Sequence, residues 1–191
     1  MTGRFLAAAA ALVLAASTAA AAIKNDEKTI STVIVTGNTV EARLLAELIQ
    51  RHTKQPILYI DHLKPRAVSF VPAQVEAEED EEPVNNVLLV ETKEYSNFIN
   101  FAHPEQVVFL GNPDHTPKYF KEKLNPAIKS YAIDHRDWMI VASQAEELFG
   151  ISGLLEEYKA EREKLEKAGV KFIPSGIEVT EPKPVLPPAA R

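Results

Sequence analysis

Hydrophobic side chains occur in short runs along the chain, and the runs alternate with segments of helical periodicity. Residues 31–36 (STVIVT) are rich in β-branched side chains and predict a strand. Residues 39–53 place apolar side chains three and four positions apart, which predicts a helix with one buried face, capped by Asn38 or Thr39. Residues 56–60 (PILYI) predict the next strand. A strand, a helix and a strand joined by short turns favour a parallel pair with a right-handed crossover.

The same alternation continues to residue 149. Further strands are predicted at 67–71 (an edge strand), 86–90, 106–110 and 128–133, and further helices at 92–102, 117–124 and from Asp134 or His135 to 149. The strands at 87–90 and 106–110 are apolar throughout, which predicts burial on both faces of a parallel sheet. The expected fold class is α/β, a three-layer Rossmann-like domain with a mostly parallel sheet of roughly four to six strands.

A charged helix is predicted at 152–167, where the apolar stripe is thin and pairs such as Glu163 and Lys167 support an exposed helix. The stripe either packs on its own domain, as stripes at helical spacing usually do, or contacts a partner. The expected organisation is a signal peptide at 1–22, an α/β domain at 29–149 with an acidic loop at 74–86, the C-terminal helix and a short strand (171–174) within 150–174, and a Pro-rich disordered tail at 175–191.

The first 22 residues have the order of a secretory signal. Arg4 supplies positive charge, residues 5–16 are apolar, and residues 17–22 (STAAAA) are small enough for a peptidase site. The apolar run is shorter than the roughly 20 residues of a membrane-spanning helix. The expected location is therefore secreted, periplasmic or at the cell surface, with no membrane span after signal cleavage. The chain has no Cys, so no disulfide supports the exported domain.

Acidic residues outnumber basic ones by 27 to 21, which gives a formal net charge of −6. Binding to nucleic acid depends on Lys and Arg side chains that neutralise phosphates, so this balance argues against a nucleic-acid partner. A soluble α/β domain of this charge is compatible with many other partners.

Two sets of residues are candidates for chemistry. The first strand ends in a Gly at the start of a helix, where free N–H groups can receive an anion, although such a Gly also serves tight turns. The candidate ligand-binding residues, which include the end of the strand at 106–110, are Thr36, Gly37, Asn38, Thr39, Gly111 and Asn112.

The second set is a repeated Asp-His dipeptide that follows three predicted strands. The carboxyl ends of parallel strands meet at one sheet edge, so the pairs are expected to converge there. Asp and His together suit a divalent metal or acid–base work, whereas Asp is also common in caps and turns. The candidate metal ligands are Asp61, His62, Asp114, His115, Asp134 and His135. No other cofactor is predicted. Trp138, the single Trp, is expected to pack in the core.

The chain resembles the type 2 cell-wall-binding repeat of bacterial and archaeal surface proteins. The resemblance covers roughly residues 31–149 and depends on the strand that ends at Gly37, on the run 56–58 (PIL), on the strand that ends at Gly111, and on Asp137-Trp138 where Arg-Tyr is usual. Asn112 stands where the family has a second Gly, and only one repeat is present. The resemblance implies a Rossmann-like fold and association with the cell wall.

These observations favour a non-catalytic binding module associated with the cell envelope or cell surface, whose partner is an envelope component or another envelope protein. One alternative is a small metal-dependent, hydrolase-like enzyme that uses the Asp-His pairs. Another is an assembly or scaffold protein that acts through the C-terminal helix. Whether the chain is an enzyme stays open, with the balance against it, since no motif of nucleotide binding or of hydrolase catalysis is present.

Overall fold

The computed structural model describes residues 30–61, 67–72, 87–116 and 118–172. The elements in chain order are β1 (Thr32–Gly37), α1 (Val40–Thr53), β2 (Ile57–Ile60), β3 (Val68–Val71), β4 (Leu88–Val90), η1 (Thr92–Glu94), α2 (Tyr95–Ala102), β5 (Gln106–Leu110), α3 (Lys118–Glu122), β6 (Lys129–Ile133), α4 (Trp138–Phe149) and α5 (Leu154–Lys167). The predicted signal peptide at 1–22, the acidic loop at 74–86, the tail at 175–191 and His62 lie outside the described residues.

The six described strands form one sheet in the order β4-β3-β2-β1-β5-β6. β1 pairs in parallel with both β2 and β5, and β5 pairs in parallel with β6. β3 runs antiparallel to both of its neighbours, β2 and β4. The fold is therefore α/β with a mostly parallel sheet, and it agrees with the predicted Rossmann-like three-layer architecture.

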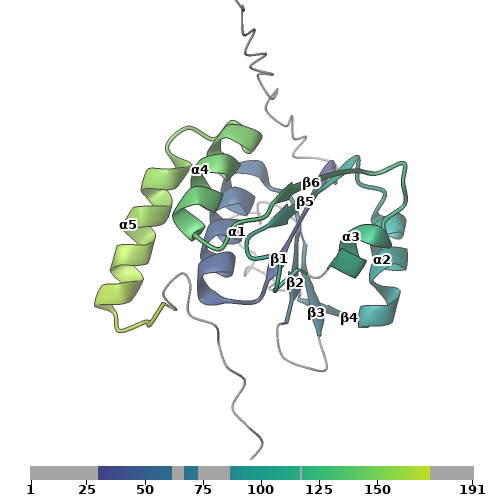
Figure 1. The fold of residues 1–191 in the computed structure, drawn as a ribbon, viewed down its shortest axis with the longest axis horizontal. Helices are drawn as coiled ribbons and strands as arrows, with labels where there is room; N and C mark the ends of the chain where they lie inside the picture. Colours follow the sequence, from purple (N-terminus) through teal and green to yellow (C-terminus); the bar gives the residue numbers. More distant parts are fainter. Residues whose placement is uncertain (1–29, 62–66, 73–86, 117, 173–191) are drawn as a thin grey trace, which may run out of the picture.

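Helices cover both faces of the sheet. Figure 1 shows α1, α4 and α5 on one side and α2 and α3 on the other. Alternate residues of β1 point to opposite sides, so Ile34 joins the core under α1 and α4, while Val35 joins the core under α2 and α3. Both side chains are 0% exposed, so successive residues of β1 are buried on opposite faces of the sheet.

Side-chain caps determine where α1 and α4 begin. The Thr39 side chain accepts a hydrogen bond from the Ala42 backbone N–H at 3.4 Å, so Thr39 is the cap of α1, as predicted. The fourth helix was expected to open at Asp134 or His135, but α4 begins at Trp138 because Asp137 is its cap and accepts from the Met139 N–H at 2.9 Å.

The prediction for the strand at 87–90 was wrong about burial. β4 lies at the edge of the sheet with β3 as its neighbour, and Leu88 and Leu89 are 52% and 81% exposed. The prediction that 67–71 is an edge strand was also wrong, since β3 lies between β2 and β4. An apolar run of this length indicates a strand, but its place in the sheet depends on which strands pair with it.

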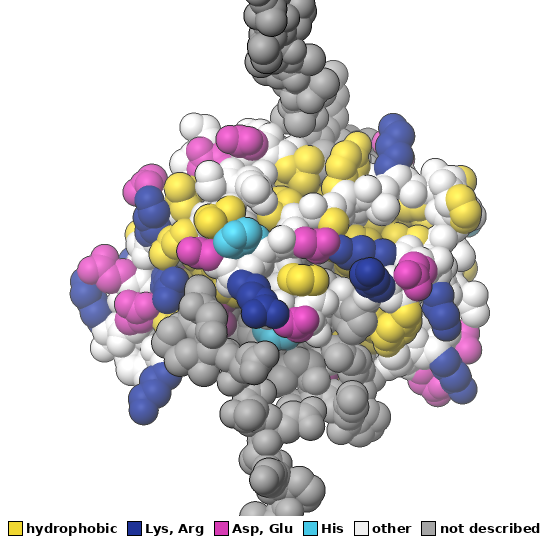
Figure 2. All heavy atoms as spheres, in the orientation of Figure 1, with side chains coloured by type: hydrophobic (Ala, Val, Ile, Leu, Met, Phe, Trp, Pro, Cys, Tyr) yellow, Lys and Arg dark blue, Asp and Glu magenta, His cyan; other side chains and the backbone are white. Residues whose placement is uncertain are grey.

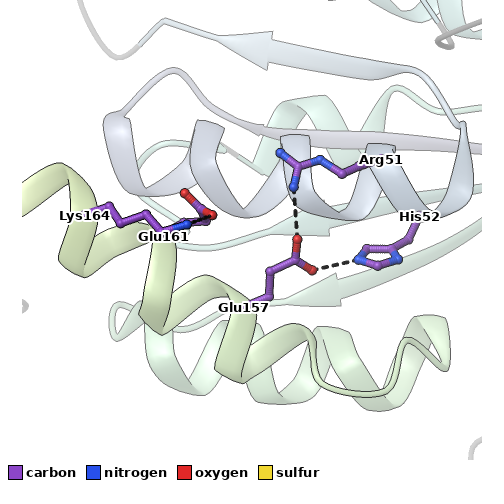
Figure 3. Close-up of polar contacts among 5 residues, drawn as sticks. All are labelled: Arg51, His52, Glu157, Glu161 and Lys164. Atoms are coloured by element: carbon purple, nitrogen blue, oxygen red, sulfur yellow. Dashed lines mark hydrogen bonds and ion pairs between the residues drawn. The ribbon is translucent and has the colours of Figure 1, made fainter.

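The C-terminal helix packs on its own domain. Leu154 and Tyr158 of α5 are 0% exposed and belong to the same core as α1 and α4. At the surface, Glu157 accepts from the Arg51 guanidinium at 3.0 Å and contacts His52 Nε2 at 2.8 Å, which ties α5 to the last turn of α1 (Figure 3). The predicted Glu163–Lys167 pair is present at 3.0 Å.

Within the described residues, no helix has both the length and the hydropathy that crossing a bilayer requires.

Candidate functional site

The candidate site lies where β1 separates β2 from β5. The chain passes from β1 to β2 on one side and later returns to β5 on the other, so the sheet changes its direction of winding at β1. In open α/β sheets, ligands bind at such a point, beyond the carboxyl ends of the strands. Thr36 pairs with Leu110 in register, so the turns that begin at Gly37 and Gly111 start side by side. The candidate ligand-binding residues are therefore brought together.

The turn after β1 is held by bonds within the protein. The Asn38 backbone N–H donates to the Ile60 carbonyl at 2.9 Å, and the Asn38 side-chain amide donates to Asp61 Oδ1 at 2.6 Å. The Thr36 hydroxyl is buried and donates to the Leu110 carbonyl at 2.9 Å. Three polar groups that the sequence offered to a ligand thus connect β1 with its two neighbours.

The electrostatics of this turn do not favour an anion. The N-terminus of α1 carries partial positive charge, which attracts anions when nothing opposes it. Here Glu41 lies in the first turn and is only 6% exposed, and the Asp61 carboxyl is hydrogen-bonded to Asn38. These two acidic groups offset the helix charge, so a neutral or cationic ligand suits the turn better than a phosphate.

The glycine of each turn accommodates a side chain of the protein itself. A Cβ atom on Gly37 would lie 2.7 Å from the Cβ of His115, closer than such atoms approach in proteins. A Cβ on Gly111 would lie 2.2 Å from the ring of Trp138, and Gly111 has a φ of 95°. In dinucleotide-binding folds, a glycine at this position lets a phosphate approach the backbone. Here His115 and Trp138 occupy the space that the two glycines leave.

Hydrogen bonds within the turn after β5 hold this turn together. The Asn112 side chain accepts from the Asp114 N–H at 3.0 Å, and the Asn112 carbonyl accepts from the His115 N–H at 2.9 Å. This turn directs His115 toward Gly37. Trp138, the first residue of α4, is 7% exposed and packs in the core between α4 and the sheet, as the sequence predicted.

The described members of the three Asp-His pairs follow three parallel strands at one edge of the sheet, but they have separate contacts. Asp61 bonds to Asn38, Asp114 pairs with Arg136 at 2.9 Å, and Asp134 pairs with Lys121 at 2.7 Å. The His135 ring accepts from the Asp137 N–H at 2.9 Å.

Across residues 30–61, 67–72, 87–116 and 118–172, no three His, Asp or Glu side chains gather in a way that would hold a metal ion. His62 lies outside these ranges, so the pair that it forms with Asp61 stays a prediction. The described members of the other two pairs contribute ion pairs and turn contacts.

Oppositely charged side chains are interspersed over the face of the molecule drawn in Figure 2, where histidines lie near the centre and apolar side chains show between them. The ion pairs Arg136–Asp114 and Lys121–Asp134 likewise place a positive side chain beside a negative one. A mixed surface of this kind is suited to specific polar contacts rather than to attraction of one charge sign.

Three tyrosine side chains of the described chain are buried: Tyr59, Tyr95 and Tyr158. Burial raises the pKa of Tyr59, Tyr95 and Tyr158 above the ordinary value of tyrosine, with the Glu47 carboxylate adding to the effect at Tyr59. The hydroxyls of Tyr95 and Tyr158, and that of Thr116, are buried without a hydrogen-bond partner among the described residues. Tyr158 was visible in the sequence as part of the apolar stripe of α5.

No family model matches the chain, and no curated protein or solved structure matches it either. The resemblance to wall-binding repeats therefore stays a prediction from the sequence.

Proposed function

We propose that this protein is an exported, non-catalytic binding module that associates with the cell envelope. The observation that carries the proposal is the packing of His115 and Trp138 against Gly37 and Gly111. A Rossmann-like enzyme uses the space beside such glycines for its cofactor or substrate. In this chain the protein's own side chains fill that space, which favours a rigid scaffold that binds through its surface.

The contacts of the candidate acid–base residues support the same proposal. Asp114 and Asp134 are neutralised by Arg136 and Lys121, and His135 supports the turn before α4. A catalytic acid or base is usually placed in a cleft with its pKa moved toward the working pH, rather than in a surface ion pair. The location in the envelope depends on the signal pattern at 1–22 and on the resemblance to wall-binding repeats.

The alternative of a scaffold that acts through α5 has less support. The apolar residues of α5 with the greatest burial, Leu154 and Tyr158, pack against α1 and α4 of the same domain. Glu157 also holds α5 to Arg51 and His52. A partner would have to bind the remaining charged face of the helix.

The test is co-sedimentation of the purified protein with envelopes isolated from the source cells. We expect the protein to pellet with the envelopes and to stay in the supernatant without them. The triple variant His62→Gln, His115→Gln and His135→Gln should pellet equally well, with circular dichroism confirming that it is folded. The metal content of the wild-type protein is measured in parallel by mass spectrometry.

Failure to pellet overturns the proposal. Stoichiometric divalent metal in the wild-type protein that disappears in the folded triple variant would instead support the metal-dependent enzyme, because only that hypothesis requires the histidines as ligands.

A further inference from the structure

We draw no further inference here: the strongest candidate, the exposed apolar edge of the sheet at β4 with Leu88 and Leu89, carries no proposal because nothing in the described part of the chain shows what covers it.

Discussion

β4 and β5 have nearly the same sequence character but different places in the structure. Both are short apolar runs, LLV and QVVFL, and both were predicted to be buried on two faces. β5 lies between β1 and β6, and its five residues are buried. β4 lies at the end of the sheet, and Leu89 is 81% exposed. The difference teaches that an apolar run specifies a strand, while the number of neighbouring strands determines its burial.

The same comparison separates the sheet into two regions with different contacts. The β1–β5 half is closed by internal contacts, since His115 and Trp138 fill the turns beyond the strands. The β3–β4 half has an apolar edge with no second neighbour among the described strands. We expect substitutions of buried residues in the first half to alter stability more than substitutions of exposed residues at the β4 edge.

High pH should unfold the protein because it ionises three buried tyrosines. Burial raises the pKa of Tyr59, Tyr95 and Tyr158 in the folded state, so folding is favoured while these phenols are neutral. Their contribution is complete below the unfolded pKa of about 10 and is lost as the pH rises above it. Circular dichroism and phenolate absorbance should change together in this range.

The control is Tyr158→Phe. The Tyr158 hydroxyl is buried without a hydrogen-bond partner among the described residues, so its removal should cost little stability and should move the alkaline transition to higher pH. Ionisation of all five tyrosines near pH 10, with circular dichroism unchanged, would contradict the prediction.

Phe109→Ala in β5 should reduce the free energy of unfolding by about 3–5 kcal/mol. Phe109 is 1% exposed and packs in the core under α2 and α3, so its truncation removes buried apolar surface and leaves a cavity. Urea denaturation monitored by Trp138 fluorescence measures the change. A loss below about 1 kcal/mol would mean that β5 is not the buried centre of this core.

Gly111→Ala should reduce the free energy of unfolding by about 2–4 kcal/mol, because the new methyl group meets the Trp138 ring in a backbone conformation that favours glycine. Gly153→Ala is the matched control. Gly153 also has a positive φ, of 83°, but a Cβ there has no atom within 4 Å, so only the backbone cost of about 1 kcal/mol should remain. Equal losses in the two variants would show that Trp138 does not press on Gly111.

Leu89→Ser should change the free energy of unfolding by less than about 0.5 kcal/mol, because this side chain is already exposed at the edge. The measurement is the same urea transition, and the comparison is with Phe109→Ala. A large loss would show that Leu89 is covered in solution and would remove the contrast between β4 and β5.

Local patterns in the sequence predicted the fold class and most elements of the described chain. The β1-α1-β2 unit is correct because its signals are local: a β-branched run, apolar spacing of three and four, and a Thr39 cap. The burial of β5 followed from its composition. The start of α4 was missed because Asp134 and Asp137 are both good caps, and only the position of β6 and the turn after it selects Asp137.

The candidate site was predicted in part. The sequence placed Thr36, Gly37, Gly111 and Asn112 at strand ends, and the parallel pairing of β1 with β5 brings the two glycines side by side. That His115 and Trp138 would fill the space beside them required the conformation of two turns distant in sequence. The ion pairs of Asp114 with Arg136 and of Asp134 with Lys121 likewise join separate elements.

The sequence by itself determined that strands and helices alternate, since periodicity and capping act over a few residues. Only the tertiary structure decided that β3 turns back between β2 and β4, and that β4 has one neighbour among the described strands. It also decided that His115 and Trp138 fill the space beside Gly37 and Gly111. The physical reason is that strand pairing and side-chain packing depend on which distant segments come together. The free energy of such a contact depends on both segments, so neither segment's sequence determines it alone.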